Sequence, residues 1–178
     1  MEVTHDIQAA ITRLPLVYQQ RGLSSATSQV CQTIVDKNLP HEPESHKAVL
    51  HLCIALCFID AADGHTTSCF EQEALRRRLA TLYESGPENS DMPLNYDVLS
   101  SVMHDASNQL TNFRLHEQIL LCVVQDDHVQ FARMTELESR LARRIKTLSA
   151  PSPSLDVSAI KTANHLTDEQ SDAVLSSI

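Results

Sequence analysis

Residues 45–64 read SHKAVLHLCIALCFIDAADG and contain the longest apolar run of the chain, Leu52 to Ile59. Ser45 can cap a helix, and the apolar side chains after it cover most of a helical surface, which is typical of a helix at the centre of a bundle. The run is shorter than the ~18 residues that a membrane span needs. We therefore expect a buried central helix that ends at an acidic corner, Asp60 to Gly64, and no membrane span.

Helical periodicity continues on both sides of this segment. Pro15 ends the first predicted helix, and Gly22 and Pro40 stand before and after the second. Ser68 and Glu71 form an S-x-x-E capping box that opens a helix after the acidic corner, and Asn95 opens the next helix. The predicted helices cover about residues 3–13, 24–37, 45–60, 68–82, 95–106, 115–127 and 134–148.

Composition limits the fold and the chemistry. The 178 residues include three glycines, too few for the turns of a β-sandwich or a doubly wound α/β domain. The glycine fingerprint of dinucleotide-binding folds, the P-loop and the G-x-S-x-G elbow are all missing from the sequence. We expect an all-α single bundle of about six to eight helices, with no catalytic residues and no bound cofactor other than a metal ion.

The C-terminal part has a different composition. Residues 149–154 read SAPSPS, which is typical of a linker, and Thr167 with Gln170 can cap a short helix further on. The predicted organisation is a helical domain over residues 1–148, a linker over 149–165 and a short terminal helix over 166–178.

Two segments of the domain are similar to each other. His51–Asp63 and Leu115–Asp127 both run from apolar into acidic residues, so the bundle can consist of two similar helical halves or of hairpins that are alike by chance. We expect one buried core that joins the two halves, formed by Leu52, Leu56, Ile59, Ile119, Leu120, Val123, Leu137 and Leu141.

The net charge of −9 argues against a general nucleic-acid binder, because such a protein neutralises phosphates with a basic face. The N-terminus carries Glu2 and Asp6 and no signal-peptide pattern, and the five cysteines stand mostly in apolar runs. These features predict a cytoplasmic protein with reduced cysteines.

Two sets of carboxylates are candidate ligands for Ca²⁺ or Mg²⁺, cations that prefer several oxygen ligands. The sets are Asp60, Asp63, Glu71 and Glu73 at the first corner, and Asp126 and Asp127 at a second one. The spacing is not that of an EF-hand. Alternatively, Asp63 and Gly64 form a turn, and the glutamates favour a helix N-terminus.

Basic residues from Arg133 to Lys146 form a stripe along the last predicted helix. It forms either ion pairs with Glu136 and Glu138 or a docking face for an acidic protein or a nucleic acid.

The run Ile54 to Gly64, followed by a helix with early glutamates, resembles the TerB-like (tellurite-resistance) family over about residues 45–148. This resemblance implies an all-α fold of two similar halves, an acidic cation site with Asp63 and Asp126 or Asp127 as its aspartates, and a non-enzymatic role in bacterial stress or defence. The eight-residue spacing from Asp63 to Glu71 and the lack of a glycine after Asp127 depart from the family pattern.

The tail, residues 166–174, reads LTDEQSDAV and resembles the segment that opens the motor of superfamily 1 helicases, with Gln170 at the adenine-contacting position. This resemblance implies an alternative function, an accessory N-terminal domain of a DNA or RNA helicase whose ATP-dependent motor would follow residue 178. The first expectation remains a helical interaction or regulatory domain that binds a protein partner.

Overall fold

The computed structural model describes residues 2–84, 94–116 and 119–148. The predicted linker and terminal helix, residues 149–178, lie outside the described residues. The described part contains six α-helices, within the predicted range, and two small antiparallel sheets, so the fold is predominantly α and not all-α as expected. The chain divides into two units, residues 1–138 and 139–178, and the second is described only for the C-terminal part of helix α6 (Ala132–Leu148).

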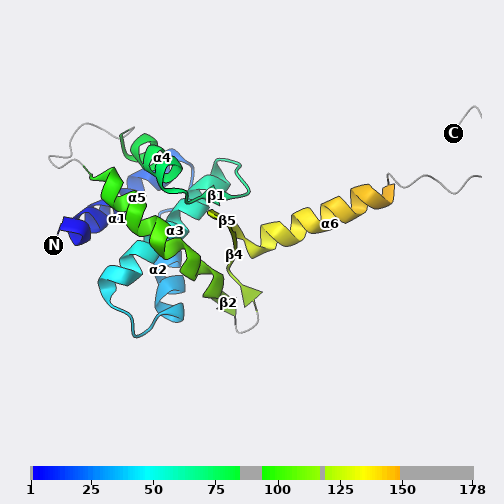
Figure 1. Cartoon of the computed structure of the whole chain (residues 1–178), viewed down its shortest axis with the longest axis horizontal. Helices are drawn as coiled ribbons and strands as arrows, with labels where there is room; N and C mark the ends of the chain where they lie inside the picture. Colours follow the sequence, from blue (N-terminus) through cyan, green and yellow to red (C-terminus); the bar gives the residue numbers. More distant parts are fainter. Residues whose placement is uncertain (1, 85–93, 117–118, 149–178) are drawn as a thin grey trace, which may run out of the picture. The chain divides into compact units, whose positions relative to one another are not determined.

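The central helix is confirmed. Helix α3 (Glu44–Ala62) buries residues on most of its surface. It contacts α1 (Glu2–Gln20), α2 (Ala26–Asn38) and α5 (Tyr96–Ser107), whose ribbons lie around it in Figure 1. It is long and apolar enough to cross a membrane by length and composition, but 67% of its apolar window is buried inside the protein. Its apolar surface is therefore explained by the packing of its neighbours around it.

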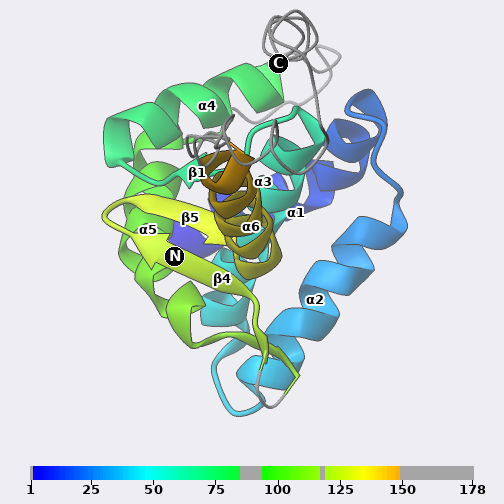
Figure 2. The ribbon, with the colours of Figure 1, turned by 90° about the vertical axis from the view of Figure 1, so that its right-hand side faces the viewer.

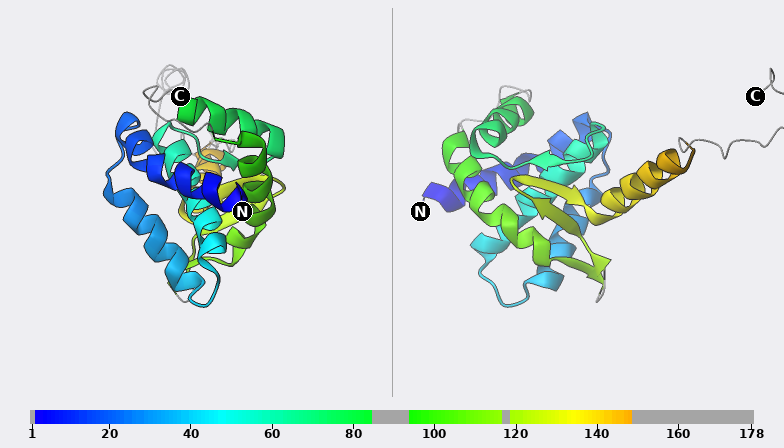
Figure 3. Two further views of the ribbon diagram at one scale, coloured as in Figure 1. Left: turned by 90° about the vertical axis from the view of Figure 1, so that its left-hand side faces the viewer. Right: turned by 45° about the vertical axis from the view of Figure 1, so that its right-hand side comes forward.

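The N-terminal helix is longer than predicted. Helix α1 continues through Pro15 to Gln20, where the chain turns at Gly22, whose φ of +70° favours glycine. Val17 and Tyr18, beyond the proline, are buried, and this tertiary burial outweighs the hydrogen bond that proline cannot donate. Helix α1 and the β4–β5 hairpin (Cys122–Gln125 and His128–Phe131) cover different sides of α3 (Figure 3).

Two predicted helix starts have different outcomes. The side chain of Asn95 accepts a hydrogen bond from the amide of Val98 and caps α5, as expected. The capping box of Ser68 and Glu71 is wrong, because Ser68 lies in strand β1 (Ser68–Cys69) and α4 (Gln72–Glu84) begins four residues later. Glu71 itself accepts hydrogen bonds from two amides of the first turn of α4 and so acts as the cap.

The helix predicted over residues 115–127 is absent, and strands take its place. Strands β2 (Arg114–His116) and β3 (Ile119–Leu120) form one antiparallel pair, and β4, β5 and β1 form a three-stranded sheet in the order β1-β5-β4. Figure 2 shows β5 between its two neighbours. The turn between β4 and β5 is made by Asp126 and Asp127, with Asp126 at a φ of +51°, so this hairpin needs no glycine.

The strands overturn the idea of two similar halves in the structure. His51–Asp63 is mostly helix and corner, whereas Leu115–Asp127 consists of strands and a turn. Residues 122–125 and 128–131 match in register across the hairpin, with Val129 buried and Gln125 exposed. Side chains of residues 122–125 and 128–131 therefore alternate between the two faces of a strand, although the apolar pattern of this segment was interpreted as helical.

Three of the eight predicted core residues are buried. Leu52, Leu56 and Ile59 are buried on α3, together with Phe70, Leu75 and Leu99 from the elements around it. The predicted members from the C-terminal part are instead exposed by 37–61%: Ile119, Leu120, Val123, Leu137 and Leu141. Ile119 and Leu120 form the exposed strand β3, and Val123 is the exposed neighbour of the buried Cys122 on β4. Because side chains alternate between the two faces of a strand, Cys122 and not Val123 points to the core.

Candidate functional site

The acidic corner at the end of α3 has two carboxylates whose side chains are only 8% and 16% exposed, those of Asp60 and Asp63. Asp60 lies in the last turn of α3 and is 6% exposed, and Asp63 is the C-cap of the same helix. Negative charge at a helix C-terminus is disfavoured by the helix dipole, and burial adds to the cost. Both carboxylates therefore need nearby positive charge.

Two arginines provide that charge from other elements. Arg78 on α4 donates hydrogen bonds to Asp60 at 3.0 and 2.8 Å and also pairs with Asp63. Arg21, directly after α1, donates to both carboxylate oxygens of Asp63 at 3.0 Å. We call these four residues the ion-pair cluster, and it joins α1, α3 and α4.

The cluster affects the ionisation of its members. Partial burial opposes the charge of Asp63, but the guanidinium groups of Arg78 and Arg21 outweigh it and lower the pKa of that carboxyl. Burial likewise opposes the charge of Arg78, and the two aspartates outweigh it and raise the pKa of the guanidinium. Each charge thus stabilises its partners in the folded state.

The sequence predicted the two aspartates as candidate ligands but not their pairing with Arg78 and Arg21. A signal for Arg78 existed, because a helical period places it on the same face of α4 as the buried Leu75 and Leu82. An arginine on an apolar face usually requires an acidic partner. For Arg21, which is 42 residues from Asp63, we find no local signal.

The predicted glutamate ligands have other partners. Glu71 caps α4 through its backbone amides, which lower the pKa of its carboxyl, and Glu73 pairs with Arg76 and Arg77 on the next turn. The alternative interpretation, glutamates at a helix N-terminus, therefore describes their contacts in the structure.

The second predicted carboxylate set lies in the β4–β5 turn. Asp127 has a carboxylate oxygen 3.8 Å from Nδ1 of His104, and its backbone oxygen accepts a hydrogen bond from the amide of Phe70. Nδ1 of His104 is also 2.8 Å from the backbone oxygen of Phe70. These contacts hold α5, β1 and the hairpin together.

The carboxylates as arranged do not fit a cation site. Asp60 and Asp63 already face two guanidinium groups, whose positive charges would repel Ca²⁺ or Mg²⁺. In residues 2–84, 94–116 and 119–148, no group of three or more histidine, cysteine, aspartate or glutamate side chains could hold a metal ion. Cation binding stays a prediction from the sequence.

A shallow, open pocket lies beside the cluster. It is lined by Asp60, His65, Thr67, Cys69, Ala74 and Arg78. Its Asp60 and Arg78 charges are paired with each other, so a charged ligand would have to compete with that ion pair.

The cysteines belong to the core. Cys53 and Cys57 on α3 and Cys122 on β4 are buried, and all are free thiols. A hydrogen bond with Cys122 and burial raise the pKa of the Cys57 thiol, and burial raises that of Cys53. Cys31 is also buried, and burial raises the pKa of its thiol to about 11. Thiols held in the neutral form are weak nucleophiles, which argues against Cys31, Cys53 and Cys57 as reactive cysteines.

The clearest exposed apolar surface is on α6. Leu137, Leu141 and Ile145 follow one another at four-residue spacing and are 48, 61 and 54% exposed. We call these three residues the α6 stripe. Large apolar side chains gathered on one helix face are typical of surfaces that bind other proteins.

Comparisons of the chain with protein-family models, with curated proteins and with solved structures found no match. The resemblances to TerB-like domains and to helicase motors therefore remain predictions from the residues that carry them.

Proposed function

We propose that this chain is a non-enzymatic helical interaction or regulatory domain of the TerB-like kind that acts in bacterial stress or defence and binds a protein partner through α6. The α6 stripe carries the proposal. Its three aliphatic side chains are each about half exposed or more, so they leave apolar surface in contact with water. A partner that covers this surface gains the free energy of removing it from water.

The rest of the described fold supports a role in presenting this surface. The bundle core and the ion-pair cluster hold residues 2–84, 94–116 and 119–138 together, and the charged groups at the acidic corner have partners within the protein. The TerB-like part of the proposal rests on the run Ile54–Gly64 and not on the second half, where strands replace the implied helix.

Site-specific photo-crosslinking in cells of the source organism tests the proposal. A photoreactive residue at position 141 should give a discrete protein adduct, whereas the same residue at exposed His41 should not. A second substitution, Leu137→Asp, should remove the adduct, because it places a charge on the α6 stripe. No adduct at position 141, or an adduct that Leu137→Asp leaves unchanged, would contradict the proposal.

The helicase alternative is supported by the charge of α6. This helix carries five basic side chains (Arg133, Arg140, Arg143, Arg144 and Lys146) and two acidic ones. Fluorescence polarisation with single-stranded DNA tests it: affinity should fall steeply with salt and weaken in Arg143→Glu. If DNA affinity changes neither with salt nor in Arg143→Glu, or if the chain does not bind DNA at low salt, the helicase alternative is contradicted and only the first proposal remains.

A further inference from the structure

The charges beside the α6 stripe are arranged unequally. With 3.6 residues per turn, Leu137, Leu141 and Ile145 cover about 80° of the helix circumference. Arg133 and Arg144, both exposed, border the Leu137 edge of this arc; we call these two residues the basic flank.

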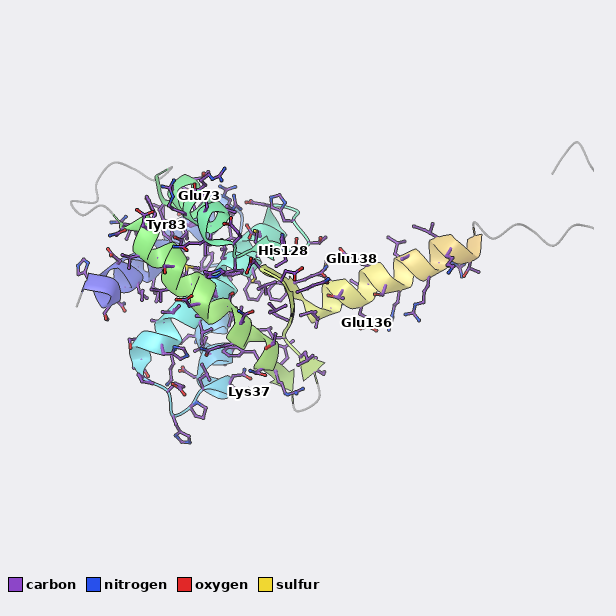
Figure 4. The ribbon with its side chains drawn as sticks, viewed as in Figure 1. Lys37, Glu73, Tyr83, His128, Glu136 and Glu138 are labelled. Atoms are coloured by element: carbon purple, nitrogen blue, oxygen red, sulfur yellow. The ribbon has the colours of Figure 1, made fainter. Side chains whose placement is uncertain are left out.

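The opposite edge of the stripe carries less charge. Glu138 and Ala142 lie there by the same helical period. Figure 4 shows Glu136 and Glu138 on different sides of α6, so the two glutamates do not form one acidic edge. The α6 stripe is therefore bordered by positive charge along one edge and by a single carboxylate along the other.

This asymmetry bears on what covers the stripe. Two copies of α6 packed antiparallel would place the basic flank of one against the basic flank of the other, and like charges at these positions repel. Two parallel copies would place the basic flank against Glu138 and Ala142, which offers one carboxylate for two arginines. A different helix with acidic residues along its flank matches both arginines.

Resting on the proposed function, we infer that the partner contributes an amphipathic helix with an apolar stripe flanked by aspartate or glutamate, packed lengthwise on α6. The apolar stripes provide the buried contact, and the acidic flank of the partner pairs with Arg133 and Arg144. Charge complementarity of this kind selects between partners and orientations.

Two designed peptides of about three heptads test this inference. Both carry leucine at the a and d positions, and one has glutamate and the other lysine at e and g. Their like-charged flanks keep each peptide from pairing with itself. Fluorescence polarisation with the full chain at low salt should show at least ten-fold tighter binding of the glutamate peptide, and the difference should shrink with added salt.

A charge-reversal variant makes the test specific. Arg133→Glu combined with Arg144→Glu should bring the preference close to equality or invert it in favour of the lysine peptide. Leu141→Asp should weaken the binding of either peptide at least ten-fold. Circular dichroism should show unchanged helix content for both variants, because all three positions are exposed.

The outcomes separate this inference from the proposed function. Equal binding of the two peptides, both weakened by Leu141→Asp, would overturn the acidic partner and keep α6 as a docking surface. Dimerisation of the chain alone, seen by sedimentation and abolished by Leu141→Asp, would identify a second copy as the occupant and also overturn the inference. Failure of both peptides to bind, together with no crosslink at position 141, would overturn the proposed function as well.

Discussion

Replacing Arg78 with methionine separates the charge of the ion-pair cluster from the packing of α4, because methionine keeps an unbranched apolar stem. The substitution removes the hydrogen bonds that the guanidinium donates to Asp60 and Asp63. Asp63 keeps Arg21 as a partner. Asp60, 6% exposed, loses the cation that the structure places beside it.

The expected loss of stability follows from this burial. Breaking a buried ion pair by removing one partner costs about 3–5 kcal/mol. The side chain of Arg78 is 26% exposed, so water screens part of the interaction, and we reduce the expected cost to about 2–4 kcal/mol. For a domain of this size that corresponds to a drop in Tm of roughly 4–16 °C.

Arg77→Met is the matched control, one residue away on the same helix. The Arg77 side chain is 71% exposed and pairs with Glu73, which is also exposed, and such surface pairs contribute about 0–1 kcal/mol. Thermal and urea unfolding followed by circular dichroism should therefore separate the two variants clearly. If Arg78→Met is no less stable than Arg77→Met, the ion-pair cluster does not hold α3 and α4 together as we argue.

A second substitution tests the cause. In the Arg78→Met background, Asp60→Asn removes the charge that was left unpaired, and we expect it to recover part of the lost stability, because a buried amide costs less than a buried carboxylate. The same substitution in the protein with Arg78 intact should be destabilising. Equal effects of Asp60→Asn in both backgrounds would show that the two residues are not coupled.

Three further predictions concern the core, acid stability and cations. Leu56→Ala should cost about 2–5 kcal/mol in urea unfolding, whereas Leu141→Ala, at an exposed position, should stay within about 0.5 kcal/mol; similar losses would contradict the burial of α3. Because the folded-state pKa of Asp63 is lowered, its contribution to stability is present above the ordinary aspartate pKa of about 4 and is lost as the pH falls through the folded-state value. Urea midpoints measured from neutral pH downwards should fall in this acid range, and less so in Asp63→Asn. Calorimetry with millimolar Ca²⁺ or Mg²⁺ should show no binding heat if the ion-pair cluster excludes cations, and saturable heat would restore the cation site predicted from the sequence.

Some features of the fold follow from local sequence. The apolar surface of residues 45–62 requires burial on all sides, and the structure has α3 at the centre of the core. Asn95 caps α5 through a contact within four residues, and the apolar period of residues 134–148 predicts α6. Each of these depends on side chains that are close in sequence, so a single segment contains the information.

Where a segment is compatible with both the helical and the strand period, tertiary contacts decide which structure it forms. Residues 119–131 carry enough apolar residues for a helix, but they form strands in which β5 pairs with β1 from another part of the chain and Phe131 lies 4.9 Å from Phe58, ring centre to ring centre. Pairing with Ser68 and Cys69 and packing on α3 are not visible within the segment itself. The low glycine content excluded a large sheet protein but not one hairpin with an Asp126–Asp127 turn.

The candidate site divides in the same way. The sequence by itself determined that acidic residues follow the central helix and that α6 has one apolar face with arginines beside it, because helical spacing alone sets which side chains share a face. Only the tertiary structure decided that Asp60 and Asp63 face Arg78 and Arg21 instead of converging on an empty corner. The physical reason is that a buried carboxylate takes the charge partner that folding brings within reach, and here those partners come from two other helical segments, 15 to 42 residues away along the chain.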